Sequence, residues 1–239
     1  VQTFADCINE FNGMIGERQV GCPLVVHRRC IEPMFSISNM ISYDNRMFNM
    51  TNKKEEYLKE EQPFLLKKSG WIDVVGPENG RKNHFVKNQA EKVCQLLEQA
   101  VEIYDNLFER DECIFIITPF RTVAESMRSF VNDYFRNKGY DRDCLISWTK
   151  KCIGTVHTFQ GKGANEVLFV LGCSKMSVGA MNWVVKKANI LNVAVTRAKY
   201  RIGFIGDMQD WKKLKYFREF IPYLIDEIQV DDSSCLFTS

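Results

Sequence analysis

The stretch Cys113-Ile114-Phe115-Ile116-Ile117 decides the fold, because its five apolar residues follow one another without a polar interruption. A strand that is buried on both faces has this pattern, and such strands are typical of parallel sheets. The later run Glu166-Val167-Leu168-Phe169-Val170-Leu171-Gly172 has the same character. Both runs therefore predict strands of a parallel sheet.

Further strands and helices alternate around these two runs. Short apolar stretches predict strands at 22–26, 71–76, 152–158 and 201–206. Apolar residues three and four positions apart predict helices at 1–17, 33–41, 88–104, 121–137, 183–200 and 211–225. This alternation is typical of an α/β fold, with an open, mainly parallel sheet and helices on both faces.

The length of 239 residues fits one large domain or two small ones, and we expect a single domain over residues 1–239. The chain carries 32 Lys and Arg against 30 Asp and Glu, a formal net charge of +2, and 45% of its residues are hydrophobic. This balance excludes a disordered acidic or basic chain, and any nucleic-acid contact must come from a local patch. Lysine and glutamate are dense early in the segment of about 50–85, which we expect to be a charged excursion on the surface.

The nine cysteines include no C-x-x-C pair, and most of them lie in apolar runs. This pattern predicts reduced thiols in a cytoplasmic protein, and with only three histidines we expect no metal site. No apolar run approaches the ~20 residues that cross a bilayer, so we expect no membrane partner. The chain starts at Val1 without a signal peptide, which suggests that it is part of a longer protein.

Ligands of open α/β sheets bind at the carboxyl ends of the strands. The predicted strands end at 27–29, 118–120, 158–161 and 206–207. The chain contains no G-x-x-x-x-G-K-[ST] phosphate loop and no nucleophile elbow. We therefore expect an α/β domain without an active site of its own.

Two segments have a specific pattern: Gly154-Thr-Val-His-Thr-Phe-Gln-Gly-Lys-Gly163 and Asn192-Val-Ala-Val-Thr-Arg-Ala-Lys199. Together they resemble the fifth and sixth motifs of superfamily 1 helicases, in the group that includes the nonsense-mediated-decay RNA helicase and its DNA-directed relatives. Residues 24–35 resemble the fourth motif of that group, and 116–120 resembles its strand ending in Thr-Pro-Tyr. The resemblance spans about 20–210.

The resemblance implies a RecA-like fold and half of a motor. The family has two RecA-like domains with ATP between them, and the first domain holds the phosphate loop and Mg²⁺. This chain resembles the second domain alone. The implied partners are ATP with Mg²⁺, single-stranded DNA or RNA, and the P-loop domain of the same full-length protein, and we expect this chain by itself to be inactive.

Two arginines match the catalytic positions of the family. On a helix over 183–200, Arg197 would lie opposite the apolar face, where an arginine is ordinarily a solvated charge. The resemblance instead implies an arginine finger that reaches the γ-phosphate, for which the planar guanidinium is suited. Arg29 matches the fourth-motif arginine with the same target, and a surface salt bridge is its alternative.

The predicted nucleotide contacts are Gln160, Gly161, Gly163 and Arg28. Gly161 permits close backbone approach and Gln160 both donates and accepts. Family members usually carry glutamate, which meets the ribose, where Gly163 stands, and Glu166 opens the next strand instead. A tyrosine that stacks on the base is common where Arg28 stands; a guanidinium can also stack, and a solvated charge is the alternative.

The predicted nucleic-acid contacts are Thr155, His157, Thr118 and Asn192. Thr155 and His157 match family positions that touch the nucleic-acid backbone, and hydroxyl contacts of this kind position a strand without reading its sequence. His157 could equally be a core histidine. Thr118 and Asn192 could instead have purely structural roles, Thr118 at the end of a strand and Asn192 at the start of a helix.

A second class of function stays open, namely a RecA-like module that has lost catalysis and binds nucleic acid or protein. Gly163 and the non-aromatic Arg28 favour it, whereas Arg29, Gln160 and Arg197 favour the helicase domain. A metabolic α/β enzyme has no catalytic constellation in this sequence.

Overall fold

A computed structural model describes residues 13–15, 17–20, 25–51, 64–80 and 83–227. Its centre is a five-stranded sheet in the order β5-β9-β8-β6-β7. The strands are β5 (Gly70–Asp73), β6 (Ile114–Thr118), β7 (Ile153–Thr155), β8 (Ala164–Val170) and β9 (Ala198–Gly206). Every neighbouring pair is parallel, which confirms the predicted open α/β architecture.

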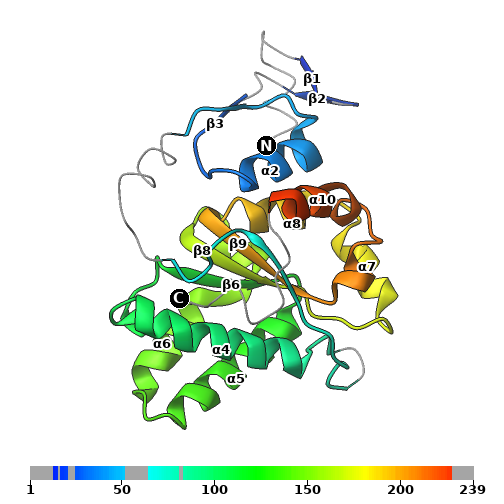
Figure 1. The fold of residues 1–239 in the computed structure, drawn as a ribbon. Helices are drawn as coiled ribbons and strands as arrows, with labels where there is room; N and C mark the ends of the chain where they lie inside the picture. Colours follow the sequence, from blue (N-terminus) through cyan, green and yellow to red (C-terminus); the bar gives the residue numbers. More distant parts are fainter. Residues whose placement is uncertain (1–12, 16, 21–24, 52–63, 81–82, 228–239) are drawn as a thin grey trace.

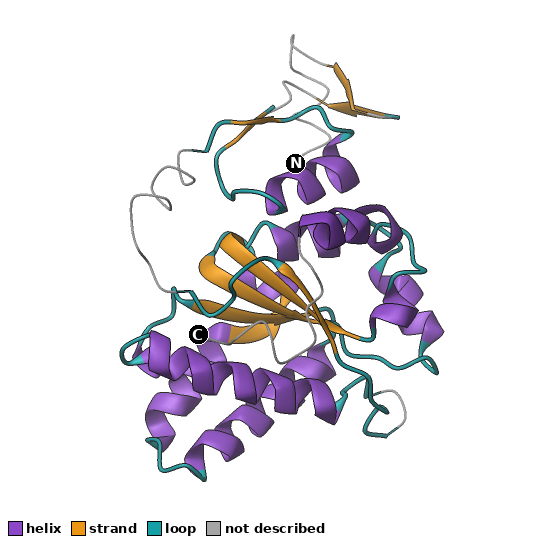
Figure 2. Ribbon diagram, viewed as in Figure 1, coloured by secondary structure: helices purple, strands orange, loops and turns teal. Residues whose placement is uncertain are grey.

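Helices flank both faces of the sheet (Figure 1, Figure 2). The larger ones are α2 (Met34–Tyr43), α4 (Lys87–Ile103), α5 (Arg121–Arg136), α6 (Arg142–Cys152) and α10 (Phe217–Glu227). The short ones are α7 (Val178–Val184), α8 (Asn189–Val195), α9 (Met208–Trp211) and the 3₁₀ turns η1 (Leu107–Glu109) and η2 (Val156–Phe159). In Figure 1, α4, α5 and α6 lie below the sheet, and α8 and α10 lie above it.

The central strands are buried as their apolar runs predict. All five residues of β6 are buried, and six of the seven residues of β8 are buried between the two helical layers. The predicted helices at 88–104 and 121–137 are confirmed as α4 and α5, because their apolar residues at helical spacing face this core.

The amino-terminal part forms two small sheets outside the main one. Strand β1 (Gly13–Ile15) pairs antiparallel with β2 (Arg18–Val20), and β3 (Val26–His27) pairs parallel with β4 (Phe48–Asn49). The helix predicted over 1–17 is therefore wrong at 13–15, where glycines at 13 and 16 disfavour a helix. Residues 1–12 lie outside the described part, as do 22–24 of the strand predicted at 22–26.

The predicted surface excursion at 50–85 is wrong for much of its described part. Leu65 and Leu66 are buried, and Gly70–Asp73 is the edge strand of the main sheet. Trp71 stacks on Phe204 of β9 with ring centroids 5.7 Å apart, which anchors this edge. The charge-rich residues 52–63 lie outside the described part, and their composition masked the apolar residues that follow them.

Two further predictions fail where the chain turns earlier than the apolar pattern indicates. The strand predicted at 152–158 spans only Ile153–Thr155, because a tight turn brings Thr158 back against Gly154, where a Cβ would lie 3.0 Å from the threonine side chain. The helix predicted at 183–200 is two short helices, α7 and α8, and its last residues start β9. Pairing of Ala198 with Ala164 of β8 gives the chain an extended conformation there.

Candidate functional site

The candidate residues lie at opposite ends of the parallel strands. We call these the carboxyl edge and the amino edge of the sheet. Thr118 and Thr155 are paired at the carboxyl ends of β6 and β7. Ala164 and Ala198 are paired at the amino ends of β8 and β9, so Gly163 lies at the other edge. The candidate residues therefore do not all gather at the carboxyl ends of the strands. The short η2 turn carries the chain from one edge to the other.

Arg197 is buried at the amino edge, which corrects its predicted place on the outer face of a helix. Its side chain is 4% exposed. Its Nη1 donates to the carbonyl oxygens of Phe159 (3.1 Å) and Lys162 (2.9 Å), and its Nε donates to that of Val193 (3.1 Å). Its Nη2 lies 3.2 Å from Oγ1 of Thr196. The sixth-motif arginine thus holds the turn that follows the fifth-motif strand.

The charge of Arg197 has no carboxylate partner among the described residues. Burial lowers the pKa of Arg197 to about 10, and the positive charge of Arg29 contributes to the same shift. The side chain remains protonated at neutral pH. A desolvated cation bound only by neutral oxygens next to a second cation is a site that favours an anion.

A backbone hydrogen bond holds the segment that contains Arg29 at the amino edge. The N–H of Ile31 donates to the carbonyl oxygen of Lys199 at 3.2 Å, which ties the fourth-motif segment to the start of β9. Arg28 and Arg29 are both exposed, whereas the preceding His27 is buried and accepts from the N–H of Cys30 through Nε2 at 3.1 Å. The structure thus brings Arg29 and Arg197 together and leaves Arg28 on the surface.

The turn between η2 and β8 has an open surface. Gln160 and Gly161 are exposed, and Gly161 has a φ of 87°, a left-handed conformation that favours glycine. Gly163 has no such positive φ. A Cβ on Gly163 would lie 3.2 Å from the carbonyl oxygen of Arg197 and 3.9 Å from Cε of Lys199. A side chain at position 163 would therefore project beside the cationic group.

The predicted nucleic-acid contacts are not equally accessible. His157 is exposed, which excludes the alternative of a core histidine, and Thr155 is half-buried with its Oγ1 3.3 Å from Oγ1 of Thr158. Thr118 is 1% exposed, and its Oγ1 accepts from the N–H of Phe120. Asn192 accepts the hydroxyl of Ser38 at 2.6 Å, a bond that joins α8 to α2. The structure thus gives Thr118 and Asn192 structural roles.

Glu166 does not face the cationic group. It is fully buried on β8, where its carboxylate accepts the N–H groups of Leu65 and Leu66 and the hydroxyl of Tyr104. Burial raises the pKa of Glu166, and these three donors, together with the charge of Arg201, oppose the shift. Glu166 therefore fixes the segment that leads into β5 and cannot substitute for the family glutamate at position 163.

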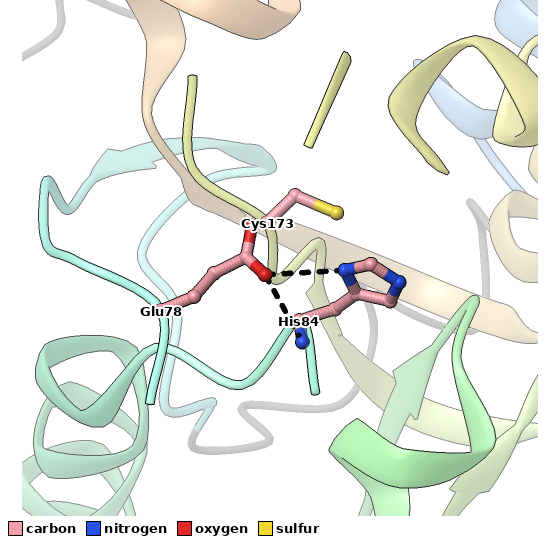
Figure 3. Close-up of side chains that lie close together, drawn as sticks. All are labelled: Glu78, His84 and Cys173. Carbon is pink, nitrogen blue, oxygen red and sulfur yellow. Dashed lines mark hydrogen bonds and ion pairs between the residues drawn. The ribbon is translucent and has the colours of Figure 1, made fainter. Parts of the chain in front are cut away.

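Sequence analysis missed a cluster of Glu78, His84 and Cys173, whose potential metal-ligating atoms lie within 4.8 Å of one another (Figure 3). One oxygen of Glu78 accepts from the N–H of His84 and lies 3.2 Å from its Nδ1, and the other accepts from the N–H of Ser174 at 2.8 Å. Burial raises the pKa of the Cys173 thiol and so disfavours a thiolate ligand. Hydrogen bonds account for both carboxylate oxygens, and we interpret the cluster as a lock between two loops. Its members are too far apart in sequence to form a recognisable motif.

The chain is similar both to a protein-family model and to a known helicase. A family model, AAA_12, described as an AAA domain, matches residues 11–209. Helicase SEN1 of Saccharomyces cerevisiae is 27% identical over 181 residues, which cover 70% of this chain and 7% of that protein. The chain thus corresponds to a small part of that relative's length. Within the described residues, no helix is both long and apolar enough to cross a bilayer.

Proposed function

This chain belongs to the AAA_12 family and is similar to superfamily 1 helicases of the Sen1 group, and on that premise we propose that it is the second motor domain of an ATP-dependent helicase. In this proposal, residues 1–239 form one RecA-like domain. The phosphate loop, which the sequence lacks, and the Mg²⁺ ligands come from a P-loop domain of the same full-length protein.

The observation that carries the proposal is the pair of cations at the amino edge. The N–H of Ile31 donates to the carbonyl oxygen of Lys199, which ties the segment of Arg29 to the residues that follow Arg197, and the charge of Arg29 contributes to the lowered pKa of Arg197. A buried arginine whose hydrogen-bond partners within the described part of the chain are all neutral oxygens favours an anion. The triphosphate of ATP is such an anion, and a guanidinium fork fits phosphate oxygens. These residues therefore fit the γ-phosphate end of ATP.

Arg197 needs a change of partners to act as a finger. Four of the five N–H groups that a guanidinium carries have acceptors within this domain. When the two domains close, the side chain would exchange carbonyl oxygens for phosphate oxygens. A phosphate oxygen adds charge attraction that a carbonyl oxygen lacks, and its geometry suits the guanidinium fork, which favours the exchange. ATP supplies the phosphoryl group, and Arg197 stabilises the charge that develops on it.

The same exchange would couple ATP to nucleic acid. The carbonyl oxygens of Phe159 and Lys162 belong to the turn that starts at Thr155 and His157, at the opposite edge of the sheet. Release of Arg197 would loosen this turn, and with it the side chains proposed to hold the nucleic-acid backbone. A change of grip with nucleotide state is what a stepping motor requires.

The free thiols of the six described cysteines support an intracellular location.

Three observations favour the alternative of a non-catalytic module that binds nucleic acid or protein. Arg197 is satisfied within the domain, and neither a carboxylate at position 163 nor an aromatic ring at position 28 is present. In that case Arg197 would be only a structural arginine.

Phosphate release from ATP separates the two functions. We expect the 239-residue chain alone to show no turnover above background, with or without single-stranded nucleic acid. The full-length protein should hydrolyse ATP and be stimulated by the nucleic acid. Turnover by the chain alone that survives repurification would contradict the two-domain proposal. A full-length protein that binds nucleic acid without hydrolysing ATP would establish the non-catalytic alternative.

A further inference from the structure

A stretch without acidic residues surrounds an exposed tryptophan. From residue 167 to residue 196, the chain contains three lysines and no aspartate or glutamate, although the whole chain carries a net charge of only +2. Lys175, Lys186 and Lys187 in this stretch are exposed. Trp183, on α7, lies between them in sequence with 51% of its surface exposed. Because the chain as a whole is nearly neutral, it could bind nucleic acid only through a local group of positive charges such as this one.

Trp183 packs on the ring of Phe120. Its ring centroid lies 5.9 Å from that of Phe120 with an interplanar angle of 35°, and the ring of Phe120 lies 4.8 Å from that of His84. Phe120 is buried and lies two residues after the carboxyl end of β6. Packing on one side thus fixes the indole while its other surface stays open to solvent. A ring held in this way loses little conformational entropy on binding a ligand.

This aromatic group lies at the edge that carries the proposed nucleic-acid contacts. Thr118, two residues before Phe120, is paired with Thr155 on β7. A nucleic-acid strand bound at Thr155 and His157 would therefore lie at the same edge of the sheet as the Trp183 ring, which is on the far side of β6.

We propose that Trp183 is a base-stacking platform for single-stranded nucleic acid, with Lys175, Lys186 and Lys187 contacting the phosphates beside it. The inference rests on the proposed function, since it takes nucleic acid as the ligand of this domain. Aromatic rings next to a cationic track are the common device for binding single strands without sequence preference. The positive charges of the stretch favour this ligand over an apolar protein segment. Arg121 is not part of the platform, because its Nε pairs with Glu125 at 2.8 Å.

The chain offers a direct optical test. It has four tryptophans, all in the described part, and Trp71, Trp148 and Trp211 are at most 4% exposed. Stacking of a base on Trp183 should therefore quench that tryptophan alone. The titration uses oligothymidylate and oligouridylate of about 12 nucleotides. Fluorescence anisotropy of a labelled oligonucleotide measures binding independently.

Four variants separate stacking from general contact. Trp183→Ala should abolish the quenching and weaken binding by about 5- to 150-fold, as expected for one stacked base. Trp183→Phe should lose the quenching but retain most of the affinity. Met176→Ala, at an apolar residue next to Lys175 in sequence that is 89% exposed, should change little. Phe48→Ala, at an exposed ring on β4 outside the main sheet, serves as the distant control.

The outcomes also distinguish this inference from the proposed function. If the oligonucleotide binds the wild type and Trp183→Ala equally, without quenching, the platform is refuted while nucleic-acid binding by the domain stands. If no oligonucleotide binds the wild type at all, both proposals fail. If quenching occurs with double-stranded DNA but not with single strands, the stacking inference is wrong. Melting temperatures of the variants within a few degrees of the wild type would show that all are folded.

Discussion

Nη1 of Arg197 lies 2.9 Å from the carbonyl oxygen of Lys162, so the arginine of one motif holds the turn of another that precedes it by 35 residues. This bond makes Arg197 both a structural element and the proposed finger. The two roles can be separated by experiment, because stability depends on the carbonyl partners whereas turnover depends on phosphate.

Arg197→Ala in the full-length protein should lower kcat by about 10³-fold or more, since supplied arginine fingers contribute on that scale. It should also lower the free energy of unfolding by about 2–3 kcal/mol, because the carbonyl oxygens of Phe159, Lys162 and Val193 lose their charged donor. Steady-state phosphate release and urea unfolding measure the two effects.

Arg197→Lys is the matched control. A lysine ammonium can reach some of the same carbonyl oxygens but cannot reproduce the planar fork. Stability should recover in part while kcat stays low. If kcat stays within a few-fold of wild type in both variants while stability falls, Arg197 is structural only, and the non-catalytic alternative gains the support.

Hydrophobic pattern predicted the centre of the fold because the centre is apolar. The β6 run is buried on both faces, and α4 and α5 have a clear apolar face, so their spans followed directly. The same method failed around Arg197. It extended a helix through 183–200 because apolar residues recur there, but the acceptors that bury Arg197 are backbone carbonyl oxygens, which no side-chain pattern reveals.

The candidate site was predictable in its residue types and not in its arrangement. The motif match selected Arg29 and Arg197 as candidates, and the structure ties the segment of Arg29 to the start of β9, just after Arg197. The sequence did not show that Thr118 is buried or that the candidates lie at two edges. Both facts depend on where β7 ends, and that end depends on the close contact of Gly154 with Thr158. Trp183 and Phe120 meet across 63 residues, a distance over which local periodicity carries no information.

Glu166→Gln should lower the free energy of unfolding by about 1.5–3 kcal/mol. The carboxylate accepts on both oxygens, from Leu65 and Leu66, whereas an amide offers one oxygen and turns an NH₂ group toward the other donor. Urea unfolding measures the loss. Glu112→Gln, at an exposed carboxylate that pairs with Arg110, is the control and should change stability by less than about 1 kcal/mol. Equal effects of both changes would refute the role of Glu166 in fixing the segment that leads into β5.

Glu78→Gln should destabilise the protein at neutral pH and less so in acid. Burial by itself would raise the pKa of Glu78, but hydrogen bonds from Ser177, Ser174 and His84 outweigh it and lower the pKa. A lowered pKa in the folded state means that the carboxylate stabilises above its ordinary value of 4.5 and loses this effect as the pH falls through the lowered pKa. The difference in unfolding free energy between wild type and variant should therefore shrink below about pH 4.5.

The metal alternative for this cluster has its own readout. If Glu78, His84 and Cys173 act as a loop lock, Zn²⁺ and a chelator should leave the melting temperature unchanged. A rise with Zn²⁺ in the wild type that Glu78→Gln removes would identify a metal site instead, because binding to the folded state alone stabilises it.

Gly163→Glu should create a preference of the full-length protein for ATP over dATP. In the family that this chain resembles, a glutamate at this position binds the ribose. One charged hydrogen bond is worth roughly 10- to 100-fold in affinity. Gly163 does not have a positive φ, so a side chain is compatible with the backbone, but its Cβ would lie 3.2 Å from the carbonyl oxygen of Arg197. Gly163→Ala shares that close contact without the carboxylate. Both variants should therefore melt slightly and equally lower, while only the glutamate changes the ratio of the ATP and dATP dissociation constants. Equal ratios in both variants would mean that position 163 does not face the sugar.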